Sequence, residues 1–228
     1  AVGASNFFVT EFNSGGSLLY STYVGGGGLV LEIPPVPDIE LGDAGTGIRI
    51  DSDNNVWLTG AVTSRTNVIP GLPFPGSDGS TDGCFQDNNG TFSTGFGQGP
   101  LVTVVVFELD TGNNTIPFLT FVPGEMLEVP TALAIDGSNN LYVTGMTYST
   151  EFPITFSSHE AAQTVNNAAG NGKGPSFIFG PGTGTTNAFL TELNPASSDC
   201  SNIDLLGGPV PAAAGGGAPQ TPSAWTRP

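Results

Sequence analysis

The sequence predicts an all-β protein built from antiparallel hairpins, and three observations support this fold class. A stretch at Ile48–Gly60, IRIDSDNNVWLTG, returns at Leu133–Gly145 as LAIDGSNNLYVTG, with six of the thirteen positions identical. Each copy has a short apolar run, a turn rich in Asp and Asn, and a second apolar run that stops at Gly, which is the pattern of a β-hairpin. No window shows the apolar recurrence at three and four residues that indicates a long helix.

A second hairpin pattern alternates with the first. Apolar runs at 6–12 and 17–24 flank an Asn-Ser-Gly-Gly turn, and the strand VTEFN at 9–13 returns as VFELD at 106–110 and as LTELN at 190–194. The two patterns together predict hairpins at 6–24, 48–60, 102–122 and 131–146, with a last one beginning at Asn187.

The spacing of these hairpins divides the chain into segments. Three prolines, Pro34, Pro35 and Pro37, forbid a central strand where they stand, so we expect an inserted loop or extended arm there. The segments expected are a first repeat at 1–66 with a Pro-rich insertion at 27–41, an irregular loop at 67–100, a second repeat at 101–151, an irregular loop at 152–186, a third half-repeat at 187–206 and a low-complexity tail at 207–228.

Charge and cysteine content restrict the partners and the compartment. Four Lys+Arg against 20 Asp+Glu give a net charge of −16, which excludes nucleic acid as a partner and disfavours anionic membranes. No apolar run approaches 18 residues, so we expect no membrane insertion. The composition suits an extracellular or cell-surface protein, in which Cys84 and Cys200 form a disulfide; two separate thiols are the alternative.

One turn carries the only candidate metal ligands. Asp51, Asp53 and Asn55 alternate oxygen-bearing side chains, as at the start of a calcium-binding loop. The sister turn, which begins at Asp136, lacks the middle carboxylate, and neither turn continues to a distal Glu. A hairpin turn closed by Asp and Asn side chains is the alternative, and apart from calcium we expect no cofactor.

The sequence offers no catalytic motif. His159 is the single histidine, it lies directly beside Ser158, and no G-x-S-x-G elbow occurs, so we expect neither an enzyme nor a zinc site. Two sequons make Asn89 and Asn113 candidate glycosylation sites. Four aromatic residues on expected strands are either core residues or a sugar-binding platform: Tyr20, Tyr23, Trp57 and Tyr142.

The repeated motifs resemble those of a known family. DNNVWLTG and SNNLYVTG, taken with FFVTEFNSGGSLLYSTYVGG, FLTELNP and the segment Glu-Phe-Pro at 151–153, are similar to the bacterial SBBP repeats, a family of β-propeller repeats. The resemblance covers about half the chain and implies blade-like hairpin meanders in two full repeats plus a half. So few blades cannot close a ring, because a propeller needs at least four. An immunoglobulin-like sandwich completed by a strand from a neighbouring subunit is the alternative fold.

An open set of blades suggests a function in assembly. We expect a bacterial, non-enzymatic subunit of an extracellular filament or surface assembly whose partner is another copy of itself. The expected assembly strand holds Phe7, Phe8, Val9 and Phe12, which would pair with an open edge on the next copy. The alternative is a secreted propeller-like module of a longer protein that binds carbohydrate or serves in adhesion, with glycans as its partners.

Overall fold

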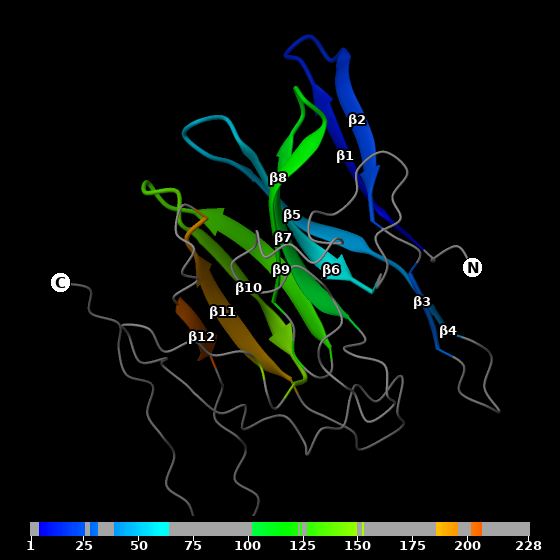
Figure 1. The fold of residues 1–228 in the computed structure, drawn as a ribbon, viewed down its shortest axis with the longest axis vertical. Coiled ribbons are helices and arrows are strands. Elements are labelled where there is room, and N and C mark those ends of the chain that lie inside the picture. Colours follow the sequence, from blue (N-terminus) through cyan, green and yellow to red (C-terminus); the bar gives the residue numbers. More distant parts are fainter. Residues whose placement is uncertain are drawn as a thin grey trace, which may run out of the picture.

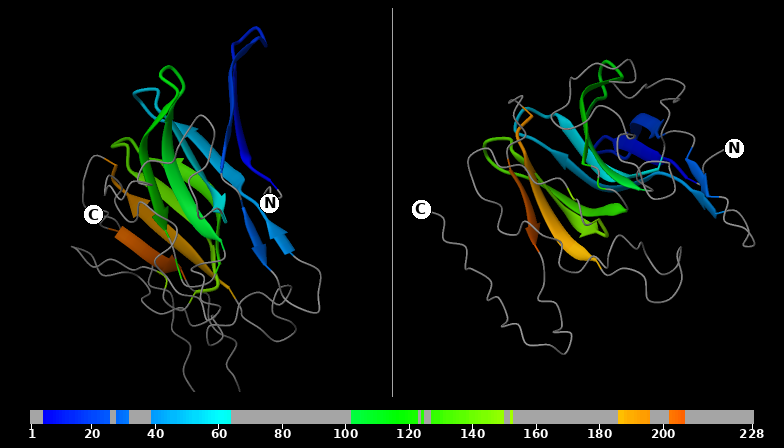
Figure 2. Two further views of the ribbon diagram at one scale, coloured as in Figure 1. Left: turned by 45° about the vertical axis from the view of Figure 1, so that its right-hand side comes forward. Right: turned by 60° about the horizontal axis from the view of Figure 1, so that its bottom comes forward.

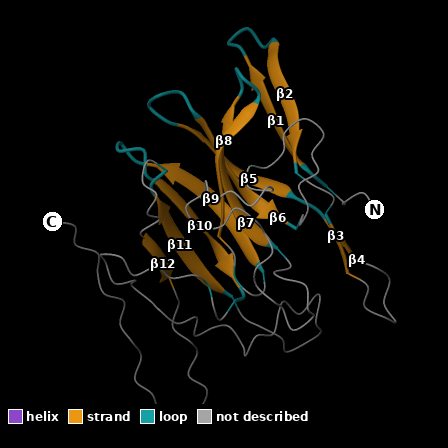
Figure 3. Ribbon diagram, in the orientation of Figure 1, coloured by secondary structure: helices purple, strands orange, loops and turns teal. Residues whose placement is uncertain are grey.

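Every regular element in the part of the chain that the structure describes is a β-strand (Figures 1 and 3). The structure is a computed structural model, and it describes residues 5–25, 28–31, 39–63, 102–122, 124, 127–149, 152, 186–195 and 202–206. The strands are β1 (Phe7–Phe12), β2 (Leu18–Val24), β3 (Leu29–Leu31), β4 (Ile39–Leu41), β5 (Ala44–Ile50), β6 (Val56–Val62), β7 (Thr103–Asp110), β8 (Thr115–Val122), β9 (Glu128–Ile135), β10 (Leu141–Thr147), β11 (Asn187–Leu193) and β12 (Asn202–Leu206). The all-β prediction is therefore confirmed. None of the described residues forms a helix long and apolar enough to cross a membrane.

The twelve strands among the described residues form four antiparallel sheets. The half-sheet, as we call it, is β1–β2; the first sheet has the order β5-β6-β7-β8, and the second sheet has the order β9-β10-β11-β12. Strands adjacent in sequence are adjacent in each sheet, so each four-stranded sheet is a meander. Figure 2 shows the half-sheet, the first sheet and the second sheet as successive layers. The prediction of open, blade-like meanders is confirmed, and the described strands show no immunoglobulin-like sandwich.

Each four-stranded sheet combines one hairpin of each sequence pattern. The hairpin β5–β6 joins β7–β8 through the pairing of β6 with β7, and β9–β10 joins β11–β12 through the pairing of β10 with β11. The half-sheet has only the second pattern, because in the described part of the chain no strand pairs with β1 except β2. The described strands thus occupy three equivalent sheet positions, and the first of these has two described strands where the others have four.

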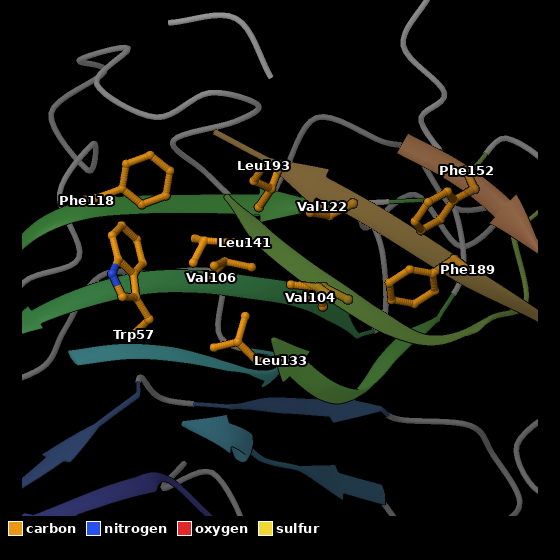
Figure 4. Close-up of a cluster of buried hydrophobic side chains, with 11 residues drawn as sticks. Trp57, Val104, Val106, Phe118, Val122, Leu133, Leu141, Phe152, Phe189 and Leu193 are labelled. Atoms are coloured by element: carbon orange, nitrogen blue, oxygen red, sulfur yellow. The ribbon is translucent and has the colours of Figure 1, made fainter. Parts of the chain in front are cut away.

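An apolar core fills the space between each pair of neighbouring layers. Between the first and second sheets, Trp57, Val104 and Val106 of the first sheet meet Leu133 and Phe189 of the second (Figure 4). Trp57 also packs edge-on against Phe118, with ring centroids 5.5 Å apart. Phe152, from the Glu-Phe-Pro segment, stacks on Phe189 at 4.9 Å and closes one end of this core.

The opposite face of the first sheet packs on the half-sheet. Phe7, Val9 and Val24 of the half-sheet are buried together with apolar residues of β6, β7 and β8. The first sheet is therefore covered on both faces, which explains why β7 reads as a nearly continuous apolar run. The pair β3–β4 forms a separate two-stranded arm that projects from this body (Figure 1), at the position where we expected an insertion.

Candidate assembly site

The turn at Asp51 is closed by the Asp51 carboxylate. Its Oδ1 accepts hydrogen bonds from the backbone amides of Asp53 and Asn55, and its Oδ2 accepts from Asn55 Nδ2 and Trp57 Nε1, all at 2.9 Å. Burial raises the pKa of Asp51, but the hydrogen bonds from Trp57, Asn55 and Asp53 outweigh burial, so this pKa lies below its ordinary value of 3.8. The carboxylate is held charged by donors from its own hairpin.

The sister turn repeats this geometry at Asp136. The amides of Ser138 and Asn140 donate to its Oδ1 at 2.8 and 2.9 Å, and Asn140 Nδ2 and the Tyr142 hydroxyl donate to its Oδ2 at 2.8 and 3.2 Å. The side-chain amide of Asn140 contributes most to lowering the pKa of Asp136. Asn139 has a φ of 63°, in the left-handed region that Asn tolerates better than other side chains.

The expected calcium ligands lie in this turn network. Donors from the chain occupy both oxygens of Asp51, and Asn55 donates its side-chain amide to Asp51. Asp53 Oδ2 accepts a hydrogen bond from Asn139 Nδ2 at 3.2 Å, and Ser52 Oγ lies 3.3 Å from Asn139 Oδ1. These contacts join the turns of the first and second sheets. The described residues contain no group of three or more His, Cys, Asp or Glu side chains that could hold a metal.

Acidic side chains gather near these turns. Burial raises the pKa of Glu108, and the negative charges of Asp51 and Asp110 raise it further. Glu192, which has the corresponding position in the second sheet, accepts a hydrogen bond from the Tyr142 hydroxyl at 3.0 Å. This end of the sheets is therefore a hydrogen-bonded acidic rim.

The expected assembly strand is β1, and its two faces differ. Phe7 and Val9 are buried in the core against the first sheet. Phe8 and Phe12 point away from that core and are 74% and 60% exposed. Tyr23 lies directly opposite Phe8 on β2 and is 73% exposed. We call this the outer face of the half-sheet; Leu18 and Leu19 are exposed beside Phe12, and the hydrogen-bonded pair Thr10 and Ser21 is the polar part of a mainly apolar surface.

The edge of β1 that points away from β2 is open in the described part of the chain. The strands that correspond to β1 in the other sheets, β7 and β11, are each paired on both sides. Next to this open edge, Ile48 and Ile50 of β5 are 48% and 64% exposed, although the counterpart of Ile48, Leu133, is 1% exposed. Ile48 pairs with Leu58, which packs on the half-sheet, so Ile48 faces the space that two further strands of the half-sheet would cover.

We define the candidate assembly site as the open edge of β1 together with Ile48 and Ile50. Sequence reasoning selected β1 but missed both isoleucines. The signal was present in the repeat alignment, because Ile48 corresponds to Leu133. Leu133 is covered by the neighbouring sheet, whereas Ile48 is exposed because the half-sheet has no described strands that would cover it.

The remaining predicted residues are either structural or outside the described residues. Asn113 is exposed in the β7–β8 turn, where its side-chain amide donates to Asp110 Oδ2 at 2.7 Å. Trp57 is buried, and the Tyr20 hydroxyl donates to Asn114 Oδ1 at 2.7 Å. The residues outside the described ranges are Cys84, Cys200, Asn89 and His159.

Comparison with known proteins agrees with this geometry. Residues 129–153, which include most of β9, all of β10 and Phe152, match the SBBP family model, a β-propeller repeat. A comparison with curated proteins found no match. Stacked four-stranded antiparallel meanders are the architecture of propeller blades. Residues 129–153 thus match an SBBP-type β-propeller repeat, and the described four-stranded sheets are open, blade-like meanders.

Proposed function

We propose that this protein is a non-enzymatic structural subunit of an extracellular filament or surface assembly, in which a neighbouring copy supplies strands to the open edge of β1. The observation that carries the proposal is the half-sheet, which has two strands where its two counterparts have four. The exposure of Ile48 and Ile50 beside it supports the same idea, since strands added to β1 would cover both side chains. The acidic composition supports an extracellular location.

Strand addition at this edge is favourable for two physical reasons. An unpaired edge presents backbone N–H and C=O groups, and each hydrogen bond made there contributes about 1 kcal/mol net. Covering the isoleucine side chains adds about 25 cal/mol for each Å² of apolar surface removed from water. Phe7 and Val9 stay in the core of their own chain, so β1 accepts strands through its second edge and does not leave its hairpin.

The hairpin geometry identifies the backbone groups that take part. The amide of Asn13 donates to Ser17 O, so it points toward β2. Because amides alternate sides along a strand, the amides of Phe8, Thr10 and Phe12 point to the open edge. The Thr10 side chain contacts only Ser21 Oγ, at 3.2 Å, among the hydrogen bonds of the described residues.

A proline at Thr10 tests the proposal. Thr10→Pro removes an amide from the open edge and leaves the amides that face β2 in place, as proline does on edge strands. We expect the wild-type protein to form filaments visible by negative-stain microscopy, Thr10→Ala to do the same, and Thr10→Pro to lose them while keeping its far-UV circular dichroism. Filaments that persist in folded Thr10→Pro, or a wild-type mass by light scattering that stays monomeric at all concentrations, would overturn the proposal.

A further inference from the structure

The second sheet has an outer face that corresponds, position by position, to a buried face of the first sheet. Trp57, Val104 and Val106 of the first sheet are at most 3% exposed because the second sheet covers them. The residues aligned with them in the second sheet are Tyr142, Ala188 and Leu190. These are half-buried or exposed, and Met146, which aligns with Ala61, is 37% exposed.

The outer face of the half-sheet is the matching surface. The strand alignment places Phe8 at the position of Phe189, and Phe12 at the position of Leu193. Both counterparts in the second sheet are fully buried, in the core that also contains Val104 and Val106. Within one chain, therefore, Phe189, the counterpart of Phe8, packs in a core with Val104 and Val106, which are the counterparts of Ala188 and Leu190.

The two outer faces also differ in side-chain size in a complementary way. The outer face of the half-sheet has large side chains: Phe8, Phe12, Leu18, Leu19 and Tyr23 are each at least 58% exposed. The outer face of the second sheet has small side chains at Ala132, Ala134 and Ala188, all exposed, beside the larger Tyr142, Met146 and Leu190. Large side chains on one sheet fill the space above small ones on the next, as interdigitated cores require.

We propose that the outer face of the half-sheet of one copy packs on the outer face of the second sheet of another copy, head to tail. The proposal rests on the proposed function only because both take the partner to be a second copy of the chain. The contact itself involves the faces of the sheets and not the edge of β1. The contact repeats between chains the packing that joins the sheets within a chain. Because the two surfaces differ, the contact is heterologous and either closes into a ring or continues as a filament.

Ring closure has a simple stoichiometry. Each copy contributes three sheet positions, so two copies in a closed ring supply six, which is within the four to eight blades of known propellers. A closed dimer would therefore satisfy every outer face without forming a filament.

Mixing two variants tests the head-to-tail contact. Phe8→Asp damages the outer face of the half-sheet, and Ala188→Asp damages the outer face of the second sheet; both positions are exposed, so each variant can fold. With Ile50→Asp added to both variants so that strand addition at the edge of β1 is blocked, we expect each variant alone to be monomeric by light scattering, with head-to-tail association weakened roughly 30-fold or more. A one-to-one mixture is expected to form dimers and nothing larger, because each mixed dimer has one intact contact and two damaged faces.

Ile50→Asp is the matched control. Ile50 is as exposed as Phe8 is, within ten percentage points, but it lies under the open edge and on neither outer face. Ile50→Asp should keep the head-to-tail contact and lose only strand addition. Filaments in Phe8→Asp that disappear in Thr10→Pro would overturn the stacking proposal and uphold the proposed function. Closed wild-type dimers that dissociate in Phe8→Asp would uphold the stacking proposal and overturn strand addition. A one-to-one mixture that stays monomeric would overturn head-to-tail packing.

Discussion

The same hydrogen-bonded type of turn recurs at hairpin ends of this molecule. A side-chain oxygen of Asn13, Asp51, Asp110 or Asp136 accepts hydrogen bonds from two backbone amides that follow it in the chain. In the two sister turns, the residue three positions later is an Asn with φ near 65°, namely 68° at Asn54 and 63° at Asn139. The turn geometry therefore explains why the first Asp and the two Asn residues of the repeated turn are identical in its two copies.

At the residue scale, we predict that Asp51→Asn destabilises the protein more than Asp136→Asn does. An asparagine places an N–H₂ group against the Trp57 indole N–H, which is buried and then has no acceptor, at a cost of about 1–3 kcal/mol. The tyrosine that corresponds to Trp57, Tyr142, still has Glu192 as an acceptor in Asp136→Asn. Urea denaturation at pH 7, followed by tryptophan fluorescence, measures both losses.

The same pair of variants has a defined pH dependence. The folded-state pKa of Asp51 lies below 3.8, so its charged form stabilises the fold above about pH 4, and this contribution is lost as the pH falls through the folded pKa. The stability difference between wild type and Asp51→Asn should therefore shrink below pH 4. A difference that stays constant from pH 7 to pH 3 would contradict the assigned role of the carboxylate.

At the scale of the element, close approach between layers fixes one residue type in β6 and β10. A Cβ at Gly60 would collide with the Phe7 ring and with the Ala44 carbonyl oxygen, and a Cβ at Gly145 would collide with the Val129 carbonyl oxygen. These glycines end the repeated stretch in the sequence. Glycine is required at these strand positions because a neighbouring side chain or backbone atom occupies the place that a Cβ would take.

We predict that Gly60→Ala destabilises the protein by about 1–3 kcal/mol, as overpacking of a core does. The methyl group would push Phe7 away from the first sheet and loosen the half-sheet. Gly137→Ala is the control, since a Cβ there meets nothing within 4 Å and the position has no positive φ. Thermal melts of the two variants should separate clearly, and equal melting temperatures would show that Phe7 does not pack on Gly60 in solution.

At the scale of the whole molecule, the three layers stack on one another in the same way, and the two outermost faces of the stack differ from each other. Copies that meet through these faces each have a net charge of −16, so they repel one another at long range. The contact surfaces themselves are mainly apolar, and Glu192, which pairs with Tyr142, is a charged residue on the second-sheet face. Association should therefore be limited by general repulsion more than by specific ion pairs.

We predict that salt strengthens self-association. Raising the ionic strength from 0.05 to 0.5 M shortens the screening length from more than about 10 Å to a few Å, which removes most of the repulsion between copies. Sedimentation or light scattering at fixed protein concentration should show an increase in mass with salt, and a variant with both Phe8→Asp and Ile50→Asp, which lacks both contacts, should remain monomeric throughout. A decrease in mass with salt would indicate that ion pairs hold the copies together.

Much of the fold could be predicted from the sequence because hairpins are local. The alternation of apolar residues and the Asx turns are encoded within about a dozen residues, so the expected hairpins coincide with β1–β2, β5–β6, β7–β8, β9–β10 and the start of β11. The choice of β1 as a candidate for assembly came from the same local pattern. The resemblance to SBBP repeats added the blade-like arrangement, and the family match at 129–153 agrees with it.

The sequence by itself thus determined the strands, the turns and the presence of repeated units. Only the tertiary structure decided which hairpins share a sheet, that Phe7 is buried while Phe8 is exposed, and that Ile48 is uncovered where Leu133 is buried. The physical reason is that a period of two defines two faces of a strand but does not say which face another layer covers. That choice depends on contacts between residues far apart in the chain, and in the described part of this chain it leaves one edge and two faces uncovered.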